Sequence, residues 1–328
     1  MSLKKQRILK TIIFTLIGIG LFVYSIFIFV PRKLKPSEAT RFYRGMGYRD
    51  EPKDSLDAMI IGTSDAFSCF SPSYIFEKHG LKTYNCGVSK QSVLGMRKQL
   101  EDIVKYQKPQ AIIVETDAIY YSNYGEMEYL WVKGIDFMEK YHLFWKDLSF
   151  KNFYSIPNYP HDPLRGFIFR KNITVPERFR EDYYLEDRET KPEKFDKGVK
   201  KNLNKIVDIC ENNDIKVFFF ASYSSATWTD GRHNAIQKFC DSRDVEFIDA
   251  EDYRAEIGFD DLTDYYDKRD NGGGDHLNVN GAHKVTEFLA QKLINDYGVE
   301  AKLDSKAQIK ERDWQERDLE HYHKLLES

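Results

Sequence analysis

A serine, a histidine and an acid stand far apart in this 328-residue chain, at positions suited to nucleophilic chemistry. The apolar run Met59–Ile61 breaks into Gly-Thr-Ser, which is typical of a buried strand that ends in a tight turn and leaves the hydroxyl of Ser64 accessible. His276 follows Asp275 in a polar stretch just before the last apolar helical pattern. A serine with an acid–histidine pair supplies a nucleophile and its base. We therefore expect the fold to bring Ser64 and His276 together.

Asn85 and Gly87 follow the next apolar run and add a third element to this pattern. A glycine after a strand permits close backbone approach, so the N–H of Gly87 can point towards Ser64. Taken alone, each element has an ordinary structural interpretation, with Ser64 as a helix cap and His276 as a surface residue. We expect Asn278 to cap the final helix and His276 to act as a general base.

Short apolar runs alternate with helical patterns along most of the chain, as in an α/β fold whose parallel sheet is covered on both faces. Ligands of such sheets bind beyond the carboxyl ends of the strands, which is where Ser64 is expected. The expected strands lie at 56–61, 81–86, 111–114, 217–221 and 245–248, and the expected helices at 92–106, 195–212, 233–241 and 279–297.

Residues 118–194 interrupt this alternation and are rich in aromatic side chains. The segment is too long for an ordinary loop, so we expect an inserted subdomain or lid. Its rings would either stack on sugar rings or form a small core of the insertion itself. At the other end, the highly charged stretch 301–328 predicts a surface helix without chemistry.

An apolar stretch at 12–30 is just long enough, at about 1.5 Å per residue, to span a ~30 Å hydrocarbon layer. Four basic residues precede it, which favours a cytoplasmic amino terminus, and a cleaved signal peptide is the alternative. We favour an uncleaved single-pass anchor in the cell membrane. Residues 1–35 would then be a cytoplasmic stub and anchor, 36–54 a stalk, and 55–300 a catalytic domain outside the cell.

The charge distribution narrows the classes of partner. Seven of the 49 basic residues precede Glu38 with no acid among them, which leaves 42 basic against 52 acidic residues in the rest. An acidic body argues against nucleic-acid binding, because that affinity rests on neutralising phosphates. The four cysteines lack the spacing of a metal site. We expect free buried thiols, with a Cys69–Cys86 bridge as the alternative.

Three blocks of the sequence together resemble the SGNH/GDSL hydrolase superfamily: Ile61–Ser64, Tyr84–Gly87, and Asp275–Asn278 followed by Gly281-Ala282. The resemblance covers about 55–117 and 195–297. Within this superfamily, the chain is similar in particular to a membrane-anchored branch of bacterial cell-surface proteins with DltD-like relatives. The segment Asp162–Phe167 also resembles a segment of that branch. It implies a flavodoxin-like three-layer fold around a parallel five-stranded sheet.

The resemblance also implies acyl transfer at a Ser-His-Asp type site, with Ser64 as nucleophile and His276 as base. The chain departs from the superfamily at the acid, which usually stands three residues before the histidine, where this chain has Gly273. The glycine-rich loop 271–274 could bring either Asp275 or Asp270 to the imidazole, and we favour Asp275.

The N–H groups of Ser64 and Gly87 would hold the oxyanion of that reaction, and no metal or organic cofactor is implied. The superfamily's asparagine block is missing here, since Glu115-Thr116-Asp117 follows the third expected strand. A third oxyanion donor is therefore unidentified. Asp65, directly after the serine, is an unusual neighbour that could disfavour an anionic intermediate.

Three hypotheses of function follow. The first is an esterase or acyltransferase acting on acetyl or D-alanyl esters of a cell-wall glycan or teichoic acid. The second is a catalytically weakened SGNH-fold protein that binds glycan or assists a membrane-bound O-acyltransferase, which Asp65, the missing asparagine and the displaced acid favour. The third is a cation site formed by Asp267, Asp270, Asn271 and Asp275.

Overall fold

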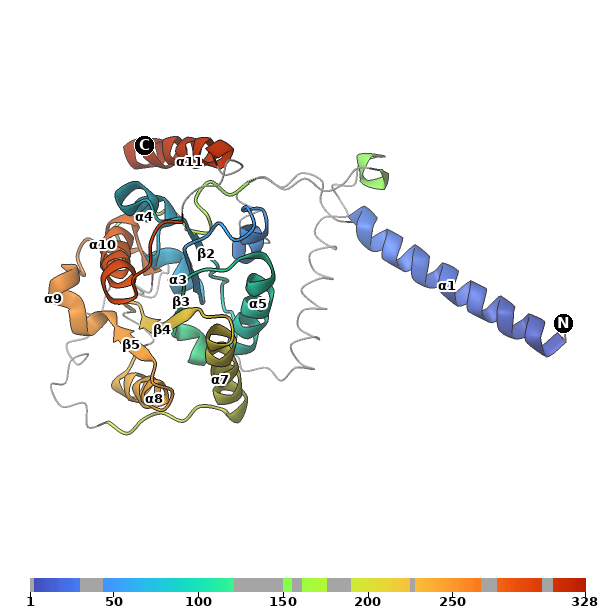
Figure 1. The fold of residues 1–328 in the computed structure, drawn as a ribbon, viewed down its shortest axis with the longest axis horizontal. Helices are drawn as coiled ribbons and strands as arrows, with labels where there is room; N and C mark the ends of the chain where they lie inside the picture. The colour runs from blue at the N-terminus through green and yellow to red at the C-terminus, as the bar shows by residue number, and fades with distance from the viewer. Residues whose placement is uncertain are drawn as a thin grey trace. The chain divides into compact units, whose positions relative to one another are not determined.

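The computed structural model of the chain describes residues 3–29, 44–120, 150–154, 161–175, 190–224, 228–266, 276–302 and 309–328. These residues fall into two compact units. The first contains helix α1 (Leu3–Phe29) and a short 3-10 helix, η4 (Phe150–Phe153). The second contains all the other described residues and is organised around a sheet (Figure 1).

A five-stranded sheet lies at the centre of the second unit, and all of its strand pairs are parallel. The strand order β2-β1-β3-β4-β5 is the flavodoxin-like one, and the order reverses at β1 and β3, where such folds bind ligands. This confirms the predicted α/β fold with a parallel five-stranded sheet. The strands are β1 (Ala58–Ile61), β2 (Thr83–Asn85), β3 (Ala111–Glu115), β4 (Lys216–Ala221) and β5 (Glu246–Asp249).

Alternate strand residues enter two separate apolar cores, one on each face of the sheet. Met59 and Ile61 lie in one core, and Ala58 and Ile60 lie in the other. Both faces of β1 are therefore buried, which explains why its sequence is a continuous apolar run. Helices α5 (Val93–Tyr106), α7 (Lys197–Glu211) and α8 (Asp230–Asp241) complete the first core, and α3 (Ser64–Cys69), α4 (Pro72–His79) and α10 (Val279–Gln291) complete the second.

The closing helix differs in part from its predicted range of 279–297. Helix α10 ends at Gln291, and Lys292–Asp296 form a π-helical turn. Asn278 caps α10 as expected, because its side chain accepts hydrogen bonds from the first-turn N–H groups of Asn280 and Gly281. An unexpected element precedes it: β6 (Tyr265–Tyr266) pairs antiparallel with β7 (His276–Leu277).

Helix α1 has the length and composition to cross a membrane, alone among the helices of the described ranges. Its apolar span is Leu3–Ser25, and none of that span is buried in the protein. The helix has 27 residues, which at 1.5 Å per residue extend about 40 Å, against ~30 Å for a hydrocarbon core.

All four cysteines are free and buried, so Cys69 and Cys86 form no bridge. Burial raises the pKa of the Cys210 thiol to about 12 and raises the pKa values of the other three as well. The thiols therefore act as small apolar side chains of the two cores.

Candidate active site

Ser64 is the first residue of helix α3, directly after the turn that ends β1. Thr63 caps this helix, and its hydroxyl oxygen accepts a hydrogen bond from the N–H of Asp65. Ser64 itself is half-buried. A helix leaves its first N–H groups without intrahelical acceptors, and the use of the Ser64 N–H as an oxyanion donor stays a prediction.

The glycine block packs directly against this turn. A Cβ on Gly87 would lie 2.7 Å from the carbonyl oxygen of Thr63, so only glycine fits here. The side-chain amide of Asn85 donates to the carbonyls of Ala66 and Phe70, which ties β2 to the serine helix. The N–H of Gly87, the second predicted oxyanion donor, donates to Oδ1 of Asn85 at 3.0 Å.

His276 lies in β7 and pairs with Tyr266 of β6. Strand β7 contacts α3, the helix that Ser64 begins. The His276 ring is parallel to the ring of Phe67, with the centroids 6.4 Å apart. Its Nε2 lies 3.7 Å from Oδ1 of Asp65, the residue next to Ser64. Two segments more than two hundred positions apart in sequence therefore meet, although the catalytic pairing of Ser64 with His276 stays a prediction.

The carboxylate beside His276 is that of Asp65, which is 5% exposed. Asp275 and Asp270, the two acids predicted to support the histidine, lie outside the described residues. All four residues of the predicted cation site, which include these two acids, also lie outside the described residues. At 3.7 Å the contact between Asp65 and His276 is too long for a hydrogen bond, and the acid that would support the histidine stays a prediction.

A buried carboxyl group supports the serine turn from the neighbouring strand. Glu115, at the end of β3, is fully buried, and its Oε2 accepts hydrogen bonds from the N–H and the hydroxyl of Thr63 at 2.8 and 2.9 Å. Its Oε1 accepts from the N–H of Asp117 at 2.5 Å. Burial, reinforced by the negative charge of Asp117, raises the pKa of Glu115 to about 8. Glu115 occupies the strand end where the resemblance leads one to expect asparagine.

The pKa of Glu115 predicts a loss of stability with rising pH. The folded protein holds the proton to about pH 8, whereas an unfolded chain releases it near the ordinary value of 4.5. The folded state binds more protons between these values, so the free energy of unfolding should fall by up to ~1.4 kcal/mol per pH unit in this window. Urea unfolding at several pH values measures this slope. Glu115→Gln should reduce this slope, and Glu251, whose pKa burial raises to about 7, accounts for part of what remains. Glu256→Gln at an exposed carboxylate should leave the slope unchanged. Equal slopes in all three proteins would refute the assignment.

Residues 162–170 make one backbone hydrogen bond to each of three elements of the site: the serine helix α3, the glycine block and the start of α10. The bonds are Ile168 N–H to Phe67 O (2.9 Å), Asn85 N–H to Arg165 O (2.9 Å) and Val279 N–H to Arg170 O (2.7 Å). Gly166 makes this contact possible, because a Cβ there would lie 1.8 Å from the carbonyl oxygen of Asn85. The segment 162–170 therefore packs against all three blocks, and we call it the wall of the candidate site.

Arg170 brings a positive charge to the same wall. Its guanidinium carbon lies 4.8 Å from the centre of the Tyr266 ring and 5.8 Å from that of Phe67. Phe67 is the ring parallel to His276, and Tyr266 is the residue paired with His276 across the two strands. Such stacking holds an arginine side chain in place. Sequence reasoning missed this residue, because a basic pair after an apolar run carries no local signal of a site.

The C-terminal helix α11 (Ile309–Glu327) is connected to this wall through buried charges. Arg165 donates to Glu51 at 2.9 Å and pairs with Asp318 of α11 at 2.8 Å. All three side chains are at least 93% buried. His161 also contacts Asp318, at 2.9 Å. The tail was expected to be a charged surface helix without chemistry, and these ion pairs add that α11 is tied to the segment around Arg165.

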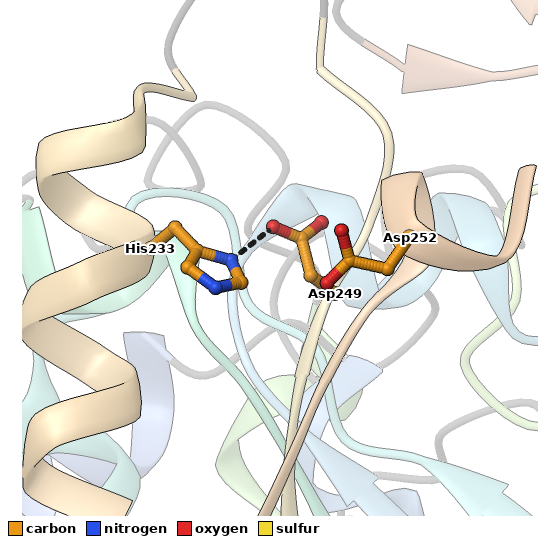
Figure 2. Close-up of side chains that lie close together, drawn as sticks. All are labelled: His233, Asp249 and Asp252. Carbon is orange, nitrogen blue, oxygen red and sulfur yellow. Dashed lines mark hydrogen bonds and ion pairs between the residues drawn. The ribbon is translucent and has the colours of Figure 1, made fainter. Parts of the chain in front are cut away.

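A second histidine–acid cluster lies at the far edge of the sheet (Figure 2). Among the described residues, His233, Asp249 and Asp252 are the group whose potential metal ligands lie within 4.8 Å of one another. Oδ2 of Asp249 already accepts hydrogen bonds from Nδ1 of His233 (2.7 Å) and Nε1 of Trp228 (2.9 Å), and Oδ1 accepts from the N–H of Glu251. Asp249 thus ties helix α8 and Trp228 to the end of β5.

No protein-family model and no curated protein matches the sequence. Solved structures with a similar arrangement include a family 3 carbohydrate esterase from Clostridium thermocellum (12% identity, 75% of this chain and 99% of that one, TM-score 0.39). Others are a lipase/acylhydrolase from Enterococcus faecalis (10%, 76% and 100%, TM-score 0.40) and an acetylxylan esterase from Geobacillus stearothermophilus (12%, 77% and 99%, TM-score 0.37). Identities and TM-scores this low do not assign a reaction to this chain.

Proposed function

We propose that the chain is a membrane-anchored serine esterase or acyltransferase that acts on acetyl or D-alanyl esters of a cell-wall glycan or teichoic acid. One observation carries the proposal: the strand that holds His276 contacts the helix that Ser64 begins, with Nε2 of His276 3.7 Å from the adjacent Asp65. Both lie at the carboxyl ends of the parallel strands, where this fold binds ligands.

In this proposal, His276 removes the hydroxyl proton of Ser64 while the serine oxygen attacks the ester carbonyl carbon. The N–H groups of Ser64 and Gly87 hold the resulting oxyanion. The bond to the alcohol oxygen then breaks, and the alcohol takes the proton from His276. Water or a sugar hydroxyl finally attacks the acyl-serine and releases the acyl group, with His276 again accepting and returning the proton.

Two further features support the choice of substrate and location. Arg170 places a cation beside the site, which suits an anionic polymer such as a teichoic acid. Helix α1 and the four basic residues in its first turns suit a single-pass anchor with a cytoplasmic amino terminus, which would leave the second unit outside the cell.

The second candidate function is a catalytically weakened protein that binds glycan or assists a membrane-bound O-acyltransferase. The position of Asp65 favours it, because a carboxylate beside Nε2 of His276 competes with the serine for that nitrogen and repels a developing oxyanion. The N–H of Gly87 is also engaged by Asn85.

A fluorophosphonate probe separates the two candidates. The esterase should react covalently at Ser64, and mass spectrometry of the digested protein should locate the adduct there. Ser64→Ala should abolish labelling, whereas Ser242→Ala, at a serine that bonds only the end of α8, should leave it unchanged. An unlabelled wild-type protein that also hydrolyses no acetyl ester would instead favour the binding function.

A further inference from the structure

The short helix η4 packs against the carboxyl-terminal end of α1, the apolar helix of the same unit (Figure 1). The side-chain amide of Asn152 donates to the carbonyl oxygen of Ile28 at 2.9 Å, and Asn152 is 4% exposed. Ile28 lies in the last turn of α1 as the structure describes it. Asn152 therefore joins η4 to the backbone of that turn.

A second hydrogen bond holds η4 one turn further back along α1. The hydroxyl of Tyr24 donates to the carbonyl oxygen of Phe153 at 3.2 Å. Two bonds to residues four positions apart fix η4 beside the last turn of α1. These contacts connect positions more than one hundred residues apart in the sequence.

The length of α1 sets the depth at which η4 would lie in a bilayer. If the span is Leu3–Ser25, Ile28 lies three residues past its end, about 5 Å beyond the hydrocarbon. If the span is instead the uncharged stretch 12–30, Ile28 lies about 3 Å inside that end. Both registers place η4 at the boundary between acyl chains and headgroups.

Three aromatic side chains are exposed at this point. Phe150 is 83% exposed, Phe153 49% and Tyr154 67%. The ring of Phe150 lies 6.0 Å from that of Phe153 and 6.2 Å from that of Tyr154, so the three form one cluster, which we call the aromatic corner. An exposed cluster of this kind is costly in water, whereas aromatic rings are enriched at membrane interfaces.

We propose that the aromatic corner inserts into the headgroup–acyl boundary of the bilayer that α1 crosses. The chain would then contact lipid twice, through the spanning helix and through a segment of the insertion held at its end. Arg32, Lys33 and Lys35 follow α1 in the sequence and suit anionic headgroups at the same boundary. The inference rests on the proposed anchoring of α1 and is independent of the ester chemistry.

Spin labels on the full-length protein test the depth of the corner. Phe150→Cys is labelled with a nitroxide and the protein is placed in nanodiscs of phosphatidylcholine and phosphatidylglycerol; the native thiols are buried and should react little. Leu16→Cys in α1 and Glu211→Cys at the exposed end of α7 provide the lipid and water references. Collisions with oxygen and with a water-soluble nickel chelate report depth. Tyr154→Cys provides a second site if the label at 150 perturbs the corner.

For the labels at 150 and 154, we expect collisions with the nickel chelate to be about threefold less frequent than for the label at 211 and about threefold more frequent than for the label at 16. Their collisions with oxygen should be more frequent than those of the label at 211. Nickel collisions equal to those at 211 would overturn the inference. Protection from both reagents would also overturn it, because it would show that protein covers the corner. A water-exposed label at 16 would show that the anchoring itself fails, whatever the result of the fluorophosphonate test.

Discussion

Replacing His276 with alanine is expected to lower kcat/KM for ester hydrolysis by about a thousandfold or more without unfolding the protein. The proposed reaction needs a base to take the serine proton and an acid to return it to the alcohol, and the imidazole does both. The side chain is partly exposed in a two-residue strand, so its loss leaves the two cores intact. Hydrolysis of p-nitrophenyl acetate and of an acetylated glycan measures the effect.

His323→Ala provides the matched control. This histidine pairs with Glu77 at the surface of α11 and lies in no part of the proposed site, so the rate should stay within about twofold of wild type. Circular dichroism should report the same fold for both variants. If His276→Ala kept a tenth of the wild-type rate, His276 would not be the base and the proposed mechanism would be wrong.

Replacing Arg165 with methionine is expected to lower the free energy of unfolding by about 3–5 kcal/mol. Arg165 neutralises two buried carboxylates, Glu51 and Asp318, and methionine fills part of its volume without a charge. Burial already raises the pKa of Glu51, and Arg165 opposes that shift. Urea unfolding at neutral pH provides the measurement.

A surface arginine and a double variant make this test specific. Arg243→Met removes pairs with Asp208 and Glu211, whose side chains are more than half exposed, and two hydrogen bonds to Asn204. It should cost clearly less than Arg165→Met, because the two acids that it leaves behind remain solvated. Combining Arg165→Met with Asp318→Asn should cost clearly less than the sum of the two single losses, because the second change removes one of the stranded charges. Additive losses would show that the buried pair is not coupled.

The sheet and its covering helices could be predicted from the sequence because both depend on local patterns. Strands buried on both faces are continuous apolar runs, as β1 and β3 are, and α5 follows a helical spacing between Ser92, which caps it, and the loop before Pro109. Asn278 was predictable as a cap for the same reason.

The contacts that the sequence did not predict are those between distant segments. Nothing near Asp65 indicates that it faces His276, since that depends on how β7 approaches α3. The contacts of Asp318 with Arg165 and of Asn152 with the backbone of α1 likewise join segments whose separation in the sequence carries no signal. β6 and β7 have two residues each, too few for a periodic pattern.

The state of the four cysteines has a consequence for where this protein can work. No thiol has to be oxidised for the chain to fold, so it needs no disulfide-forming machinery after it leaves the ribosome. Because burial raises their pKa values, the sulfurs stay as thiols rather than reactive thiolates at neutral pH. The fold should therefore tolerate reducing agents and should not depend on the thiol–disulfide balance on either side of a membrane.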